Sequence, residues 1–240
     1  MDNTDWKILE RLVSQWQEFE LRMSQLHNSI ELKPSVPNKP VAFVRSDAST
    51  ATFDCGLTLV NLPERAGRTQ SLPLYLVFRG DIIVDKSHFA KTEVLRTVHF
   101  RTEAAYFRYK SDPDRLKHVY GAHFDFDTDL TGHPRFHAQH RSFGQFSAEV
   151  DRHLGKTLPL DDCMSEVLNT VRLPCAQMDF FSVLLQAVAD RLIATTASQQ
   201  EREIFEQLIQ ISKRLHGCGH LVPSLHSTEA SSCYRSPHWY

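Results

Sequence analysis

The chain has 240 residues, of which 41% are apolar and 23% are charged. This composition is typical of soluble globular proteins, and the length suffices for one large domain or two small ones. A formal net charge of −2 argues against a chain-wide electrostatic surface for nucleic acid. No run approaches the ~18 apolar residues of a membrane-spanning helix, so we expect no membrane partner.

Cysteine usage indicates a reducing compartment. The cysteines are odd in number and lie far apart in the sequence: Cys55, Cys163, Cys175, Cys218 and Cys233. No apolar secretory segment opens the chain, whose first residues are charged and helical in pattern. We therefore expect no disulfide framework, and we predict a cytoplasmic protein.

Residues 5–30 predict an amphipathic helix. Its apolar side chains recur at steps of three and four and form one stripe, made of Leu9, Leu12, Trp16, Phe19, Met23, Leu26 and Ile30. We favour packing of this stripe on the protein's own sheet, because most amphipathic helices bury their apolar face internally. The alternative is a seam for self-association or for another protein, in which case the chain is a non-catalytic interaction module.

Strand patterns dominate the middle of the chain. A proline-punctuated link at 32–40 precedes β-branched and aromatic runs at 41–45, 51–62, 72–84 and 94–109. A hairpin at 118–141 follows them. These segments predict an antiparallel sheet of five to six strands.

Helical patterns return after residue 158. Asp161 or Asp162 caps a short predicted helix, a break at 172–174 follows, and a longer helix comes next. Ser198 and Glu201 form a capping box for the last helix, which we expect to end at Gly217. The fold class is therefore α+β, with an N-terminal helix and C-terminal helices packed on one side of the sheet. We predict a single domain over 1–220 and a C-terminal tail over 221–240.

The hairpin at 118–141 carries the most distinctive polar pattern. Because strand side chains alternate between faces, Tyr120, Phe124 and Phe126 share one face, whereas His123, Asp125 and Asp127 share the other. If the hairpin closes symmetrically about Thr131, three pairs meet across the strands: Asp127 with Arg135, Asp125 with His137, and His123 with Gln139. The result is a polar platform over an aromatic underside.

This platform suggests acid–base chemistry. Asp125 opposite His137 is a carboxylate–imidazole pair, which lets a histidine act as general base. Arg135 is suited to bind a phosphate or to stabilise developing negative charge. With His123, Asp127 and Arg141 as substrate-binding residues, the platform would perform metal-independent cleavage of RNA. The plain alternative is that opposite charges stabilise an exposed sheet face.

A metal-dependent hydrolase is a further alternative at the same place. His123, Asp125 and Asp127 project to one side with His137 opposite, and carboxylates with imidazoles suit Mn²⁺, Fe²⁺ or Zn²⁺. Alternate residues of a strand lie about 6.5–7 Å apart. We therefore expect at most two ligands from the first arm, together with His137. Glycine-rich nucleotide-binding loops are missing from the sequence, so we expect no organic cofactor.

A second cluster near the C-terminus contains ligand types that zinc prefers: His216, Cys218, His220 and Cys233. Their spacing matches none of the standard zinc-finger patterns. The alternative is a histidine-rich tail in which the spacing is incidental.

Two short segments carry a resemblance. The run Gly132-His-Pro-Arg-Phe-His137-Ala-Gln and the later Val171-Arg172-Leu-Pro174, followed by an amphipathic helix, resemble small prokaryotic families of toxin–antitoxin and mobile defence neighbourhoods. The resemblance covers about a quarter of the chain. It implies an accessory or defence-associated protein, in some members a suspected ribonuclease toxin, with His137 and Arg172 as the positions of interest.

Overall fold

The structure is a computed structural model. It describes residues 1–26, 30–35, 39–63, 74–126, 136–162, 172–174, 178–193 and 197–216. Of Phe126, Phe136, His216 and residues 172–174, it describes the backbone alone.

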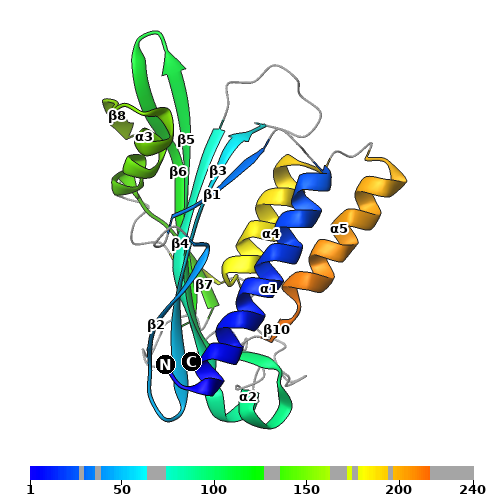
Figure 1. Ribbon diagram of the computed structural model, residues 1–240. Helices are drawn as coiled ribbons and strands as arrows, with labels where there is room; N and C mark the ends of the chain where they lie inside the picture. The colour runs from blue at the N-terminus through cyan, green and yellow to red at the C-terminus, as the bar shows by residue number, and fades with distance from the viewer. Residues whose placement is uncertain are drawn as a thin grey trace.

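A large antiparallel sheet forms the centre of the protein (Figure 1). Within the described ranges, its strands are β1 (Glu31–Pro34), β2 (Val41–Ser46), β3 (Thr50–Leu62), β4 (Leu74–Asp85), β5 (Leu95–Ser111), β6 (Asp114–Phe126), β7 (Phe136–His140), β8 (Leu160–Asp162), β9 (Arg172–Pro174) and β10 (Leu215–His216). The main path runs β1-β3-β4-β5-β6-β7-β9, while β2, β8 and β10 pair beside it. The α+β class is therefore confirmed, with more strands than the five or six that the sequence predicts.

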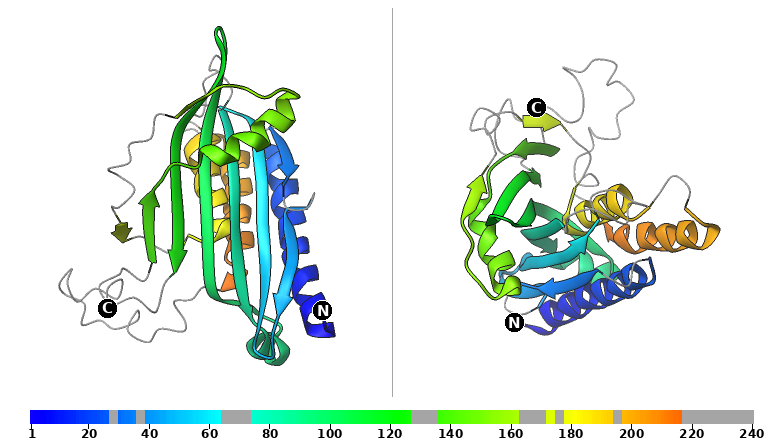
Figure 2. Two further views of the ribbon diagram at one scale, coloured as in Figure 1. Left: turned by 90° about the vertical axis from the view of Figure 1, so that its left-hand side faces the viewer. Right: turned by 90° about the horizontal axis from the view of Figure 1, so that it is seen from above.

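Helices α1 (Asn3–Leu26) and α4 (Phe180–Arg191) cover one face of this sheet, and α5 (Gln199–Ser212) packs on these two helices (Figure 2). The short α2 (Lys86–Thr92) links β4 to β5. The core between helices and sheet is rich in aromatic residues, among them Phe19 and Phe181, whose rings lie 6.1 Å apart. Gln15 of α1 also donates a hydrogen bond to the carbonyl oxygen of Ile211 in α5. The three helices and the sheet thus share one apolar core.

The apolar stripe of α1 is directed into this core. Leu12, Trp16, Phe19 and Met23 are buried there, and the partly buried Leu9 packs against them. The favoured prediction, that this stripe packs within the protein, is therefore confirmed. Self-association through residues 5–30 and a protein partner stay predictions.

Among the described residues, helices cover the opposite face of the sheet at one end. There η1 (Gly144–Phe146) and α3 (Ser147–Leu154) lie across the strands (Figure 2), and Phe146 and Val150 pack against Val77 and Phe107 in a second apolar cluster. The expectation that helices occupy one side alone was therefore wrong. The segment 142–158 has too short an apolar pattern to show in advance which face it covers.

The region after residue 158 is only partly helical. Asp161 and Asp162, expected to cap a helix, lie in β8, which pairs in parallel with β6. The expected break at 172–174 is strand β9, which pairs with β7. The residues that would form the short helix lie outside the described ranges.

The last helix begins as predicted and ends early. The capping box of Ser198 and Glu201 is present at the start of α5. The helix ends at Ser212 instead of Gly217, because Leu215 and His216 leave it and pair with β5. Across the described residues, no helix combines the length and the apolar character that crossing a bilayer requires.

Candidate functional site

Strands β6 and β7 pair in the register that the hairpin pattern predicts. Asp125 lies opposite His137, and His123 lies opposite Gln139. The third expected pair, Asp127 with Arg135, lies outside the described residues. The aromatic underside is also present, because Tyr120 and Phe124 face α4 on the helical side of the sheet.

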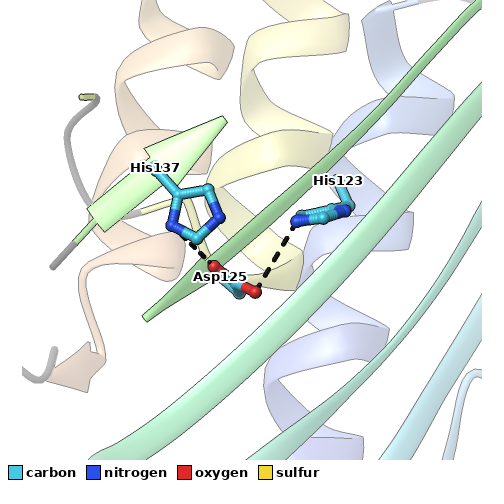
Figure 3. Close-up of side chains that lie close together, drawn as sticks. All are labelled: His123, Asp125 and His137. Atoms are coloured by element: carbon cyan, nitrogen blue, oxygen red, sulfur yellow. Dashed lines mark ion pairs between the residues drawn. The ribbon is translucent and has the colours of Figure 1, made fainter. Parts of the chain in front are cut away.

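Three side chains gather on the other face of these strands. Nδ1 of His137 lies 2.9 Å from Oδ1 of Asp125, and Nε2 of His123 lies 3.6 Å from Oδ2. The two imidazole rings are 5.5 Å apart between centroids. Figure 3 shows the carboxylate of Asp125 facing one nitrogen of each ring. One carboxylate from β6 thus contacts an imidazole of its own strand and an imidazole of the neighbouring strand.

The cluster is mostly removed from solvent. His123 and His137 are buried, while 23% of the Asp125 side chain is exposed. Two buried imidazoles therefore flank one partly exposed carboxylate.

Charge states follow from this environment. Burial lowers the pKa of His123 to about 4, with Asp125 opposing the change and His137, Arg101 and Arg141 adding to it. Burial raises the pKa of Asp125, but its contact with His137 and the nearby imidazoles lower it by more, so the pKa lies below its usual value. At neutral pH, His123 is thus a neutral imidazole beside an ionised carboxylate. These are the protonation states in which both groups bind metal ions.

The geometry suits a single metal ion. One ligand atom from each of His123, Asp125 and His137 lies within 4.8 Å of the other two. Ligand bonds of about 2.0–2.2 Å place neighbouring ligands roughly 3.0–3.5 Å apart around a tetrahedral or octahedral ion. Small rotations of the side chains therefore bring all three onto one ion. Two of the three candidates on the first arm of the hairpin thus lie close to His137, while Asp127 lies outside the described residues.

Two cross-strand rows extend the site over β4 and β5. One row reads Asp81, Arg101, Asp125, His137 across four strands, and the other reads Arg79, Glu103, His123, Gln139. Members of the rows also contact one another along a strand, as in the ion pair between Arg101 and Glu103. The sequence pattern alone does not assign these β4 and β5 residues to the site. Their alternation with apolar neighbours was visible, but no local turn showed which strand lies beside β6.

The other residues that the sequence predicts for substrate or zinc binding lie outside the cluster of His123, Asp125 and His137, or outside the described residues. Arg141 follows β7, and its backbone N–H donates to the carbonyl oxygen of Gly121. The backbone of Arg172 lies opposite Gln139 in β9, one strand beyond the cluster. Asp127 and Arg135 lie outside the described residues. So do the proposed zinc ligands Cys218, His220 and Cys233, while His216 is described by its backbone in β10.

Searches against protein-family models, curated proteins and solved structures found no match. The resemblance to toxin–antitoxin and defence families therefore stays a prediction.

Proposed function

We propose that this protein is a hydrolase that depends on a divalent metal ion held by His123, Asp125 and His137. The observation that carries the proposal is the convergence of three ligand atoms within 4.8 Å on one sheet face. Two imidazoles and one carboxylate form a common donor set for Zn²⁺, Mn²⁺ and Fe²⁺ in catalytic sites.

The positions of the three side chains support a catalytic rather than a purely structural ion. Structural zinc sites usually have four protein ligands, whereas three protein ligands leave coordination positions for water and substrate. Asp125 reaches the surface, so an ion bound here stays accessible to solvent. Such an ion supplies Lewis acidity and lowers the pKa of water bound to it to about 7.

Each residue has a separate part in holding the ion. His123 and His137 are fixed by burial, and their strands are paired in register beside them. Asp125 provides the negative charge that offsets part of the cation's charge. Because all three side chains lie on paired strands, their positions depend little on loop conformation.

Metal uptake and its effect on hydrolysis test the proposal. The purified full chain, dialysed against EDTA, is titrated with Zn²⁺ and with Mn²⁺ and assayed on a panel of chromogenic carboxylate and phosphate esters. We expect one equivalent of metal and hydrolysis of at least one ester class that appears only after metal is restored. Lack of metal uptake, or equal activity of the metal-free protein, would contradict the proposal.

Metal-independent cleavage of RNA is the second candidate function, favoured by the 2.9 Å contact between Asp125 and His137. In that mechanism Asp125 orients His137, which removes a proton from a ribose hydroxyl. The two candidates differ in their response to EDTA. RNA cleavage that persists in excess EDTA and disappears in His137→Ala would favour this mechanism over the metal-dependent one.

A further inference from the structure

We infer that the substrate is a phosphate ester, whose anionic group is bound by Arg101 and Arg141 beside the ion. This inference rests on the proposed function and adds a substrate class to it. The evidence is the placement of two cationic side chains next to the cluster, one on β5 and the other directly after β7.

Arg101 occupies the row that contains Asp125 and His137. It lies opposite Asp125 in the β5–β6 register, and 46% of its side chain is exposed. Glu103, which lies opposite His123, accepts a hydrogen bond from Nη2 of Arg101. A guanidinium carries five N–H donors, so one contact with Glu103 holds its orientation and leaves donors for an anion.

Arg141 approaches the cluster from the other side. Its backbone hydrogen bond to Gly121 continues the β6–β7 ladder by one residue, which places Arg141 on the same face as His137 and Gln139. Gln139 lies opposite His123, and Arg141 follows Gln139 by two residues with an exposed side chain. Arg101 and Arg141 therefore flank the cluster from two different strands on the same sheet face.

The number of acceptor atoms favours phosphate over carboxylate. A phosphate monoester presents three terminal oxygens that share its negative charge. It can therefore contact an ion and two guanidinium groups through separate oxygens, whereas a carboxylate has only two oxygens. Arginine forks and divalent ions are also a common combination for binding phosphoryl groups.

Paramagnetic relaxation of inorganic phosphate tests this inference. Full-length protein is loaded with Mn²⁺, uptake is verified by loss of the free-ion EPR signal, and the ³¹P relaxation rate of added phosphate is measured. We expect strong relaxation enhancement that saturates with phosphate, because the anion lies beside the ion. Arg101→Gln and Arg141→Gln should each weaken phosphate binding by about tenfold to a hundredfold, the usual value of a charged hydrogen bond, without loss of Mn²⁺.

Arg115→Gln is the matched control. Arg115 is a half-exposed arginine at the far end of β6, where it pairs with Asp161, so its loss should leave phosphate binding unchanged. Acetate at equal concentration should compete poorly. A protein that takes up no Mn²⁺ overturns the proposed function and this inference with it. If Mn²⁺ uptake is normal, three results would each overturn this inference and leave the proposed function standing. They are the absence of phosphate relaxation enhancement, equal competition by acetate, and both arginine variants behaving as the parent.

Discussion

Asp125 and His137 lie on different strands, and their side chains meet with Oδ1 and Nδ1 2.9 Å apart. The contact follows from the antiparallel register, which places the two residues directly opposite each other. His123, two residues before Asp125, joins the same carboxylate from the same strand face. A simple period-two pattern thus brings together three groups that can share an ion.

Burial distinguishes this cluster from ordinary cross-strand charge pairs. Exposed ion pairs contribute little to stability, and buried polar groups cost free energy unless they are fully paired. His123 and His137 are buried, yet apolar residues would pack there at less cost. Binding of a metal ion would account for the cost of burying these two histidines. An exposed charged sheet face would not require their burial.

We predict that Asp125→Asn weakens the binding of Zn²⁺ by more than about 100-fold while leaving the fold intact. The amide keeps the shape of the side chain but loses the negative charge that holds the cation. Isothermal titration of metal-free protein measures the affinity, and far-UV circular dichroism monitors the fold. The control is Asp114→Asn, which removes an exposed carboxylate paired with Lys156. Equal affinity in Asp125→Asn and the parent would show that the carboxylate is not a ligand.

Two glycine substitutions should differ sharply in effect. A Cβ at Gly121 would lie 2.3 Å from the backbone oxygen of Arg141 and 3.1 Å from Nε2 of His118, so β6 or the chain after β7 must move. Gly155 has a φ of +69° but open space around it, so alanine there costs only about 1–2 kcal/mol of backbone strain. We therefore predict a larger loss of unfolding free energy for Gly121→Ala than for Gly155→Ala in urea denaturation. Comparable losses would contradict the close approach of the two backbones.

The core between α4 and α1 should respond strongly to truncation. Phe181 is fully buried and packs against Phe19. Phe181→Ala should lower the unfolding free energy by about 3–5 kcal/mol, through lost burial and the cavity left behind. Leu21→Ala removes a side chain of α1 that is 55% exposed and should change stability by no more than about 0.5 kcal/mol. Similar losses of unfolding free energy in the two variants would contradict the packing of Phe181 against the buried face of α1.

A buried ion cluster at the N-terminus should make stability depend on pH. Burial raises the pKa of Asp5, but hydrogen bonds from Lys86, from the backbone of Asp2 and from Ser46 lower it by more, so the pKa lies below 3.8. Because the folded state depresses this pKa, the stabilisation is complete above the unfolded value and is lost as the pH falls through the folded one. Between pH 6 and pH 3, Tm should therefore fall further in the parent than in Asp5→Asn. Parallel pH profiles would contradict the role of Asp5.

Much of this fold could be predicted from local patterns. Strands β2 to β7, the amphipathic helix α1 and the capping box of α5 each have a periodicity or a cap that is visible in a short segment. The pairing of Asp125 with His137 was predictable for the same reason, because a turn-rich link between two alternating arms sets the register.

The remaining features depend on contacts between distant segments. Strands β8 and β9 are three residues each, and they form because β6 and β7 offer backbone partners rather than because of their own propensity. Arg101 and Glu103 belong to the site only because β5 lies beside β6. Because no local pattern shows that β5 lies beside β6, the sequence alone could not assign Arg101 and Glu103 to the site.

The most direct test of the metal centre is X-ray absorption spectroscopy at the zinc edge on full-length protein loaded with one equivalent of Zn²⁺. We predict a shell of nitrogen and oxygen ligands at about 2.0–2.1 Å with imidazole scattering beyond it, as expected for His123, Asp125 and His137. A sulfur shell at about 2.3 Å would instead indicate binding by cysteines such as Cys218 and Cys233, and would contradict the proposed centre.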